Sequence, residues 1–372
     1  MTSAAVHAIG TALPPNVLEQ PVARDLLAAQ PGLSRLGVRR LRAAFDASSI
    51  DTRHTVLDEL VDPADGSPFV GPDGLLVHPS TGVRNARYVR HVPELVLQAA
   101  RRALAGAPEL TAGDVTHVIT ASCTGFFAPG PDHVLVRELG LSPATERMHL
   151  GFMGCYAAFP ALRAARTICT ADPDAVVLVV CVELCTLHVH SGDDLDTVVA
   201  SSVFADGAAA ALVTARPPAP GRTVLGLDGF ASAVVDDGRE EMAWTIGDLG
   251  FDMVLTAAVP KVLEREVARA LEPLRADDPA LAGRPWREVD GWAVHPGGRS
   301  VLDRVQVALG LDEEQLAPSR EVLRRHGNMS SATVLFILAD LLADPDGPGR
   351  VCAVAFGPGL TVESALLSRV GP

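Results

Sequence analysis

GFMGCYAAFPALRAARTI, residues 151–168, is a glycine-containing loop that runs into an amphipathic helix, and the chain repeats this arrangement at HGNMSSATVLFILADLL, residues 326–342. Two further pairs of segments share the offset of about 175 residues. The strand VTHVITASC (115–123) corresponds to VDGWAVHPGG (289–298), and the buried strand AVVLVVCVE (175–183) corresponds to RVCAVAFGPG (350–359). A period this long is typical of a duplicated half-domain rather than of a solenoid.

Prolines and a glycine interrupt the pattern in ARPPAPGRT, residues 215–223, where we expect the boundary between the halves. Strands that alternate with helices predict an α/β protein in which helices cover the sheets. We therefore predict two duplicated halves, residues 1–215 and 223–372. A site is expected where the halves meet, with helix starts from both contributing.

The 372 residues include 31 basic and 45 acidic side chains, and the net charge of −14 disfavours binding to nucleic acid or to an anionic membrane. The longest apolar run, AVVLVVCV at 175–182, is too short to span a bilayer. The N-terminus does not resemble a secretory signal. Six cysteines are too few for a disulfide scaffold, so we expect free thiols in a reducing, cytoplasmic compartment.

Cys155 lies in the earlier of the two repeated loops, after Gly151 and Gly154 and before the alanines of the helix. A free cysteine is most often a buried core residue. A nucleophile is an equally good interpretation here, because free amides at a helix N-terminus stabilise a thiolate and lower its pKa. Pro160 predicts that the first helical turn begins at that residue or is kinked.

His295 and Asn328 occupy corresponding loop ends in the second half. His295 ends a strand in AVHPGGRS, and Asn328 lies in HGNMSS, at the place equivalent to the Cys155 loop. Taken singly, the one would be a structural histidine and the other a helix cap. Together, a thiol, an imidazole and a carboxamide suit attack on a thioester, with two donors for the charge that develops on oxygen. A hydrolase could use a similar trio.

A rival cluster is CVELCTLHVH, residues 181–190, which offers Cys181, Cys185, His188 and His190 as zinc ligands. The spacing is not a common structural-zinc pattern, and along a strand the cysteines would face away from the histidines. Cavity lining or core is the favoured interpretation, and we expect no metal. No GxxxxGK[ST] loop and no strand–GxGxxG–helix motif occurs, which disfavours nucleotide enzymes and nicotinamide dehydrogenases.

Four motifs in this order, GFMGCYAAF, HPGGRSVLD, HGNMSSATVLFIL and FGPGLTVE, resemble the type III polyketide synthases of the chalcone synthase superfamily. The resemblance extends from about residue 85 to the end. It implies a thiolase-like αβαβα layered fold and a homodimer. It also implies that Cys155 is acylated by a starter acyl-CoA. His295 and Asn328 then promote decarboxylation of malonyl-CoA and stabilise the enolate that attacks the Cys155 thioester.

The same resemblance assigns residues to a substrate cavity. Phe204 matches the gatekeeper phenylalanine between the CoA tunnel and the cavity, and residues 357–359 match a loop that bounds the cyclisation cavity. Met253 stands where plant chalcone synthases carry a second gatekeeper phenylalanine, and Trp244 stands near their cavity glycine, so the pocket is reshaped. The expected substrate-binding residues are Phe204, Cys123, Ala128, Cys185, His188, Trp244, Met253, Ser330, Gly357, Pro358 and Gly359.

The basic CoA-binding residues of the family are not reproduced one for one, because Ala43 and Ala47 occupy two of their places. Four arginines lie close by and are expected to substitute for them: Arg39, Arg40, Arg42 and Arg53. These departures disfavour a coumaroyl starter and favour a fatty or small acyl-CoA. The implied product is a pyrone, a resorcinol or another aromatic polyketide, made without a cofactor or a carrier protein.

Two kinds of alternative remain. An initiating β-ketoacyl-ACP synthase shares the fold and the trio but normally has HQAN around its histidine, where this chain has HPGG at 295–298. HMG-CoA synthase is a more distant variant of the same chemistry. Outside the enzymes, a non-catalytic thiolase-fold partner subunit normally lacks the nucleophile, whereas Cys155 is present. A metal-stabilised binding module would need zinc at residues 181–190.

Overall fold

Strands from both parts of the chain form one nine-stranded sheet in the order β11-β12-β13-β8-β1-β7-β6-β4-β5. The computed structural model describes residues 4–63, 65–238, 241–256 and 258–371. The strands of this sheet are β1 (Ala5–Ala12), β4 (His117–Ser122), β5 (Glu146–Gly151), β6 (Val176–Leu184), β7 (Asp206–Thr214), β8 (Val224–Val234), β11 (Gly291–Val294), β12 (Arg350–Gly357) and β13 (Thr361–Val370). Two small sheets are formed by β2 (Asn16–Glu19) with β3 (Thr52–Thr55), and by β9 (Met242–Gly247) with β10 (Gly250–Leu255).

Helices are interspersed with these strands along the chain. The bounds are α1 (Gln20–Ala28), α2 (Arg35–Asp46), α3 (Thr81–Gly106), α4 (Pro131–Glu138), α5 (Ala158–Ala171), α6 (Leu195–Val203), α7 (Val259–Ala276), α8 (Arg299–Leu309), α9 (Glu313–His326) and α10 (Thr333–Ala343). Because α5 begins at Ala158, Pro160 lies within its first turn, where its missing N–H has no intrahelical partner to lose. Of the two predicted possibilities, a helix start at Pro160 is therefore wrong, because the helix begins two residues before it.

The large sheet is nearly symmetric about its central pair, β1 and β8, which are joined by only two residue pairs. Outward from the centre, each side has two antiparallel pairings, β1–β7–β6 and β8–β13–β12. Each side then has a parallel pairing, β6 with β4 and β12 with β11. The strand pairs found in the sequence repeat are therefore paired in the same way in space. The division at residues 215–223, between β7 and β8, stays a prediction.

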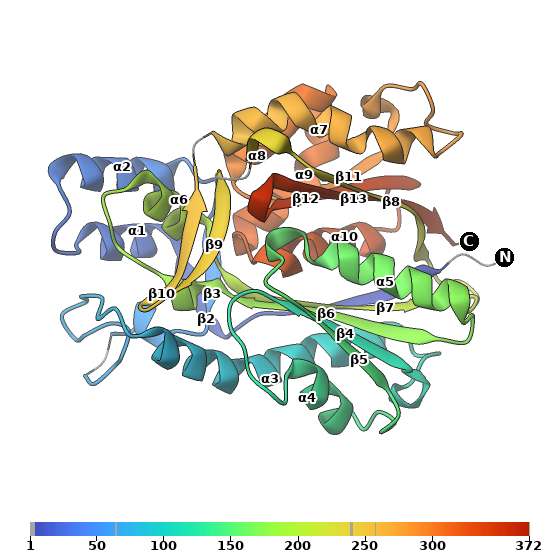
Figure 1. Cartoon of the computed structure of the whole chain (residues 1–372), viewed down its shortest axis with the longest axis horizontal. Coiled ribbons are helices and arrows are strands. Elements are labelled where there is room, and N and C mark those ends of the chain that lie inside the picture. The colour runs from blue at the N-terminus through green and yellow to red at the C-terminus, as the bar shows by residue number, and fades with distance from the viewer. Residues whose placement is uncertain (1–3, 64, 239–240, 257, 372) are drawn as a thin grey trace.

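Five layers are visible in Figure 1: helices, strands, helices, strands and helices. α3 and α4 cover one outer face, α5 and α10 lie between the two parts of the sheet, and α7, α8 and α9 cover the other outer face. This confirms the predicted αβαβα layered fold. β6 is buried along its whole length because helices cover both of its faces, which explains why its sequence is a continuous apolar run.

A further part of the molecule, at the left of Figure 1, consists of the two small sheets with α1, α2 and α6. α2 packs against both α1 and α6, and α6 packs against β10. Residues of this part form one wall of the cavity described below. Among the described residues, none of the helices combines the length and the hydropathy needed to cross a membrane.

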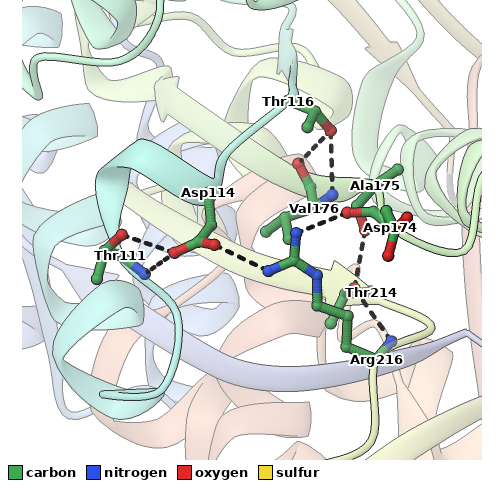
Figure 2. Close-up of polar contacts among 8 residues, drawn as sticks. All are labelled: Thr111, Asp114, Thr116, Asp174, Ala175, Val176, Thr214 and Arg216. Atoms are coloured by element: carbon green, nitrogen blue, oxygen red, sulfur yellow. Dashed lines mark hydrogen bonds and ion pairs between the residues drawn. The ribbon is translucent and has the colours of Figure 1, made fainter.

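Hydrogen bonds hold the end of β7 in place, next to the predicted boundary between the halves (Figure 2). The Arg216 guanidinium donates to Asp114 Oδ1 and to the carbonyl oxygen of Asp174, both at 2.8 Å. The other Asp114 oxygen accepts hydrogen bonds from the amide and the hydroxyl of Thr111. These contacts lower the pKa of Asp114 to about 2, chiefly through Thr111 and then Arg216. The cluster therefore ties the end of β7 to the segment that leads into β4.

Candidate active site

One cavity of about 850 Å³ is lined by all three candidate catalytic residues. Cys155 lies in a 3₁₀ turn, Gly154–Tyr156, directly before α5. His295 directly follows β11, and Asn328 lies between α9 and a second 3₁₀ turn, Ser330–Ala332, that leads into α10. The two halves of the chain thus contribute to one site, as the sequence predicted.

Cys155 is held by a tight backbone. Gly154 has a φ of +77°, and a Cβ atom there would collide with the ring of Pro358, so glycine is required at that position. Burial raises the pKa of the Cys155 thiol to about 12, and the Ser330 hydroxyl opposes this shift only partly. The predicted lowering of this pKa by helix amides is therefore wrong, because the cost of burying a thiolate outweighs them.

His295 is 1% exposed, and neither ring nitrogen has a hydrogen-bond partner among the described residues. Its backbone is fixed, because the His295 amide donates to the Val354 carbonyl at 2.8 Å. Burial lowers the pKa of the imidazole to about 3, so the ring is neutral at pH 7. A neutral imidazole has one donor and one acceptor nitrogen. Both are available to a ligand in the cavity.

Asn328 is oriented by its own loop. Its amide donates to the Val203 carbonyl at 2.8 Å, and its carbonyl accepts from Ala205 N at 2.9 Å. The side-chain Oδ1 accepts from the Ser330 amide at 2.9 Å. The Nδ2 group makes no hydrogen bond within the part of the chain that the structure describes. The carboxamide therefore keeps its donor for a ligand in the cavity.

This arrangement suits chemistry that develops negative charge on oxygen. Two neutral donors, the imidazole N–H of His295 and the amide of Asn328, line the same cavity as the thiol. Such preorganised donors stabilise an enolate or a tetrahedral oxyanion strongly when water is excluded. The thiol is protonated at rest, so it needs a base when it attacks, and the second imidazole nitrogen is an acceptor suited to that proton.

Glu183 was missed by the sequence analysis. It is the last residue but one of the buried strand β6, is fully buried, and burial raises its pKa. Its carboxylate accepts hydrogen bonds from Cys123 N and Thr124 Oγ1, both at 2.9 Å, and from Ser331 Oγ at 2.6 Å. Glu183 therefore links the loop after β4 to the 3₁₀ turn before α10. A carboxylate at the end of an otherwise apolar strand was the signal for it in the sequence.

An aromatic wall closes one side of the cavity. The rings of His188 and Phe251 stack with centroids 4.2 Å apart, and Trp244 meets both edge-on. Trp244 Nε1 donates to the Cys123 carbonyl at 2.7 Å. His188 Nε2 donates to the Thr124 carbonyl at 2.8 Å, and its Nδ1 accepts from Phe251 N at 3.0 Å. The wall is therefore fixed to the backbone beside the nucleophile.

Most of the expected cavity residues line the cavity, but three do not. Those that line it are Phe204, Cys123, Cys185, His188, Trp244, Met253, Ser330 and Pro358. Ala128 is exposed, in the loop between β4 and α4, and does not line the cavity. Gly357 and Gly359 do not line it either. Gly357 instead packs against the Tyr156 ring, where a Cβ atom would not fit.

The zinc alternative does not fit this geometry. The strand ends at Leu184, and Cys185–His188 form a 3₁₀ turn, so the expected alternation of faces along one strand is wrong. Both ring nitrogens of His188 are already hydrogen-bonded to backbone groups. Within the described ranges, no three His, Cys, Asp or Glu side chains are placed to hold a metal ion.

Of the four arginines expected to bind CoA, three do not line the cavity and one does. Arg39, Arg40 and Arg42 are exposed on α2 and do not line the cavity. Arg53 does line it but is 4% exposed, and its Nη1 donates to the carbonyl oxygens of Ser201 and Phe204, both at 2.8 Å. These hydrogen bonds join Arg53, on β3, to the C-terminal end of α6, so its side chain supports the backbone of Phe204 instead.

Comparison with known proteins matches nearly the whole chain to one family. The family model of chalcone and stilbene synthases matches in two parts, the N-terminal domain at residues 1–217 and the C-terminal domain at residues 229–371. The chain is 32% identical to the alpha-pyrone synthesis polyketide synthase-like protein Pks18 of Mycobacterium tuberculosis, covering 99% of this chain and 92% of the relative. It is 33% identical to bisdemethoxycurcumin synthase of Oryza sativa, covering 98% and 92%.

Solved structures give the same result. The crystal structure of the C-terminal type III polyketide synthase domain of Steely1 from Dictyostelium has a TM-score of 0.90 at 28% identity, covering 99% of both chains. That of PKS-I from the brown alga Ectocarpus siliculosus has a TM-score of 0.90 at 29% identity, covering 99% of this chain and 98% of that one. The chain therefore belongs to the chalcone and stilbene synthase family and is a type III polyketide synthase.

Proposed function

We propose that Cys155 carries the growing acyl chain and that His295 and Asn328 stabilise the oxygen anions of a decarboxylative condensation. The observation that carries this proposal is that a thiol and two side chains with unused donors line one cavity. The thiol attacks the starter thioester, its proton passes to His295, and CoA leaves as the protonated thiol. Malonyl-CoA then loses carbon dioxide, and the enolate carbon attacks the carbonyl of the Cys155 thioester. The C–S bond to Cys155 breaks, the Cys155 thiolate leaves, and the extended chain remains on CoA until it is transferred back to Cys155.

The starter is a fatty acyl-CoA in this proposal, and the product is a pyrone. Aliphatic side chains on one side of the cavity support the fatty starter: Leu18, Leu26, Leu27, Leu60, Val189 and Val199. Such a surface binds an alkyl chain through the hydrophobic effect. It binds a small polar starter only weakly, because little apolar area is buried. The pyrone is supported by the name of the Mycobacterium relative, which describes alpha-pyrone synthesis.

A homodimer is proposed through β5. This strand ends the large sheet, with only β4 beside it, and most of its residues are exposed. Met148 on the strand is 44% exposed. An unpaired, partly apolar edge strand is a template for pairing with another strand, and a second copy supplies an identical one. A monomeric wild type in light scattering, or a dimer unchanged by Met148→Arg, would exclude this interface.

The proposed cytoplasmic, reducing location is supported by the free thiols of all six cysteines.

The experiment uses purified protein, malonyl-CoA and a panel of short, aromatic and long-chain acyl-CoAs, with products identified by mass spectrometry. We expect pyrones from the long-chain starters and a mass adduct on Cys155. Cys155→Ala should abolish both, with Cys169→Ala, a buried thiol remote from the cavity lining, as the matched control. Product formation by Cys155→Ala would show that the nucleophile is wrong. Turnover only with malonyl-ACP would favour the β-ketoacyl-ACP synthase alternative.

A further inference from the structure

Basic side chains line the cavity on the side formed by the second half of the chain. They are Lys261 on α7 and Arg299 and Arg304 on α8. All three are exposed, so the cavity reaches solvent beside them. Lys261 is the only lysine in the sequence, in a chain whose net charge is −14. A local basic cluster at the mouth of a cavity marks a place where an anionic group of the ligand can bind.

Positive charge is in excess at this mouth. Arg304 pairs with Glu264 at 2.6 Å, and Arg299 lies 3.4 Å from Asp303. Asp303 is also paired with a fourth cation, Arg320, at 2.8 Å. The four cations thus face two carboxylates. The Lys261 ammonium forms no ion pair or hydrogen bond within the described part of the chain, so it is free for a ligand.

The α2 side of the same mouth carries no comparable cation. The α2-side residues that line it are Ala44, Ala47 and Ser48. Arg53 uses its Nη1 donor on backbone carbonyl oxygens. Phosphate groups need charged donors that face the ligand, because charge-assisted hydrogen bonds are roughly twice as strong as neutral ones. Arg53 is also buried, so the exposed charged donors on the cavity surface are on α7 and α8.

We propose that the phosphate groups of CoA thioesters are bound by Lys261 with Arg299 and Arg304, and not by the arginines of α2. This inference rests on the proposed function, because it assumes that CoA thioesters enter this cavity. The uncapped start of α8 at Gly298, which also lines the cavity, adds backbone amides of favourable polarity next to the same side chains. The pantetheine arm then extends from this cluster into the cavity towards Cys155.

The test compares substrates with and without phosphate groups. Lys261→Ala should raise KM for malonyl-CoA and for the starter acyl-CoA roughly tenfold, and the triple variant with Arg299→Ala and Arg304→Ala at least tenfold more. Turnover of the corresponding N-acetylcysteamine thioesters, which lack phosphate, should be the same in all variants. The matched control is Arg269→Ala, an exposed cation on α7 that does not line the cavity.

Binding of CoA itself, measured by titration calorimetry, separates this proposal from the proposed function. The wild type should bind CoA more tightly than Lys261→Ala, and the difference should shrink as salt is raised. Equal CoA affinity in the two proteins would overturn the proposal, as would a larger loss from Arg40→Ala than from Lys261→Ala. An equal loss of N-acetylcysteamine turnover would also overturn it. Normal CoA binding without turnover of any thioester would instead reject the proposed function.

Discussion

The loop before α5 and the loop before α10 occupy equivalent places in the two parts of the sheet, yet they present different chemistry. Each contains a 3₁₀ turn that leads into a central helix. Each has residues at positive φ, Phe152 and Gly154 in the one and Gly327 and Ser330 in the other. The backbone geometry is thus repeated. The loop before α5 presents a thiol, and the loop before α10 presents an amide whose oxygen is already satisfied.

This difference shows how a duplicated fold can divide one reaction between its halves. In the proposed function, the nucleophile belongs to the earlier loop, and the donors belong to Asn328 and to His295, which follows β11. If the division is correct, the two functions can be removed separately. Acylation of Cys155 should survive loss of the Asn328 donor but not loss of His295, which accepts the thiol proton. Decarboxylation of malonyl-CoA should survive loss of the thiol.

The largest expected effect is on the donors. Asn328→Ala and His295→Ala should each lower malonyl-CoA decarboxylation about 10²–10³-fold, since each removes one stabilising hydrogen bond from the enolate. Release of carbon dioxide from labelled malonyl-CoA measures this directly. Asn328→Asp should lower the rate further, because it keeps an oxygen for the Ser330 amide but replaces the Nδ2 donor with a negatively charged carboxylate oxygen that repels the enolate. Unchanged rates in both alanine variants would remove the roles that we assign to these residues.

A smaller effect is expected where the two loops are joined. Glu183→Ala should lower the free energy of unfolding by about 3 kcal/mol, because it leaves buried donors from Cys123, Thr124 and Ser331 without their acceptor. Denaturant titration gives the value. Glu183→Gln, which keeps an acceptor oxygen, should lose less stability. Equal free energies of unfolding for the two variants would show that the hydrogen bonds to this carboxylate do not stabilise the fold.

The smallest effect is expected at the opposite end of the first half, in the cluster of Figure 2. Asp114→Ala should lower the free energy of unfolding at pH 7 by about 1 kcal/mol, the usual size for a partly exposed ion pair. It should leave the kinetics unchanged, because Asp114 does not line the cavity.

The pH dependence of this effect has a definite sign. The pKa of Asp114 is lowered to about 2 from 3.8, so its contribution is complete above pH 4 and is lost as the pH falls towards 2. The stabilities of wild type and variant should therefore converge in that range. Asp62→Ala, which removes an exposed carboxylate, is the matched control. A difference that stayed constant down to pH 2 would contradict the role of this ion pair.

Local sequence was sufficient to predict the repeat, sheets covered by helices and the three candidate residues that share the cavity, and the resemblance supplied the layered fold. The reason is that short segments are enough to recognise a glycine loop at Gly154, a strand end at His295 and a loop at Asn328. The sheet then brings the ends of its strands together, whichever helices cover it. The positions of Phe204, Trp244 and His188 in the cavity lining, which the resemblance to chalcone synthases implied, agree with the structure.

The errors lie where several segments must pack together. Ala128 and the α2 arginines were assigned by position along the chain, but the direction in which they face depends on how their loop and helix dock. Arg53 was expected to be open to CoA, and the folded chain buries it against the end of α6. The pKa of Cys155 was assigned from helix amides alone, and burial by distant segments reverses its direction.

The amino-acid sequence by itself determined the duplication, the alternation of strands with helices and the identity of the thiol, imidazole and carboxamide, because periodicity and loop residues act over a few neighbours. Only the tertiary structure decided which charges face the cavity mouth and which are buried. It also decided that Glu183 links the two halves, and that the thiol and the imidazole are both neutral at rest. Burial and electrostatic environment are sums over segments far apart in the chain, and no short stretch of residues contains that information.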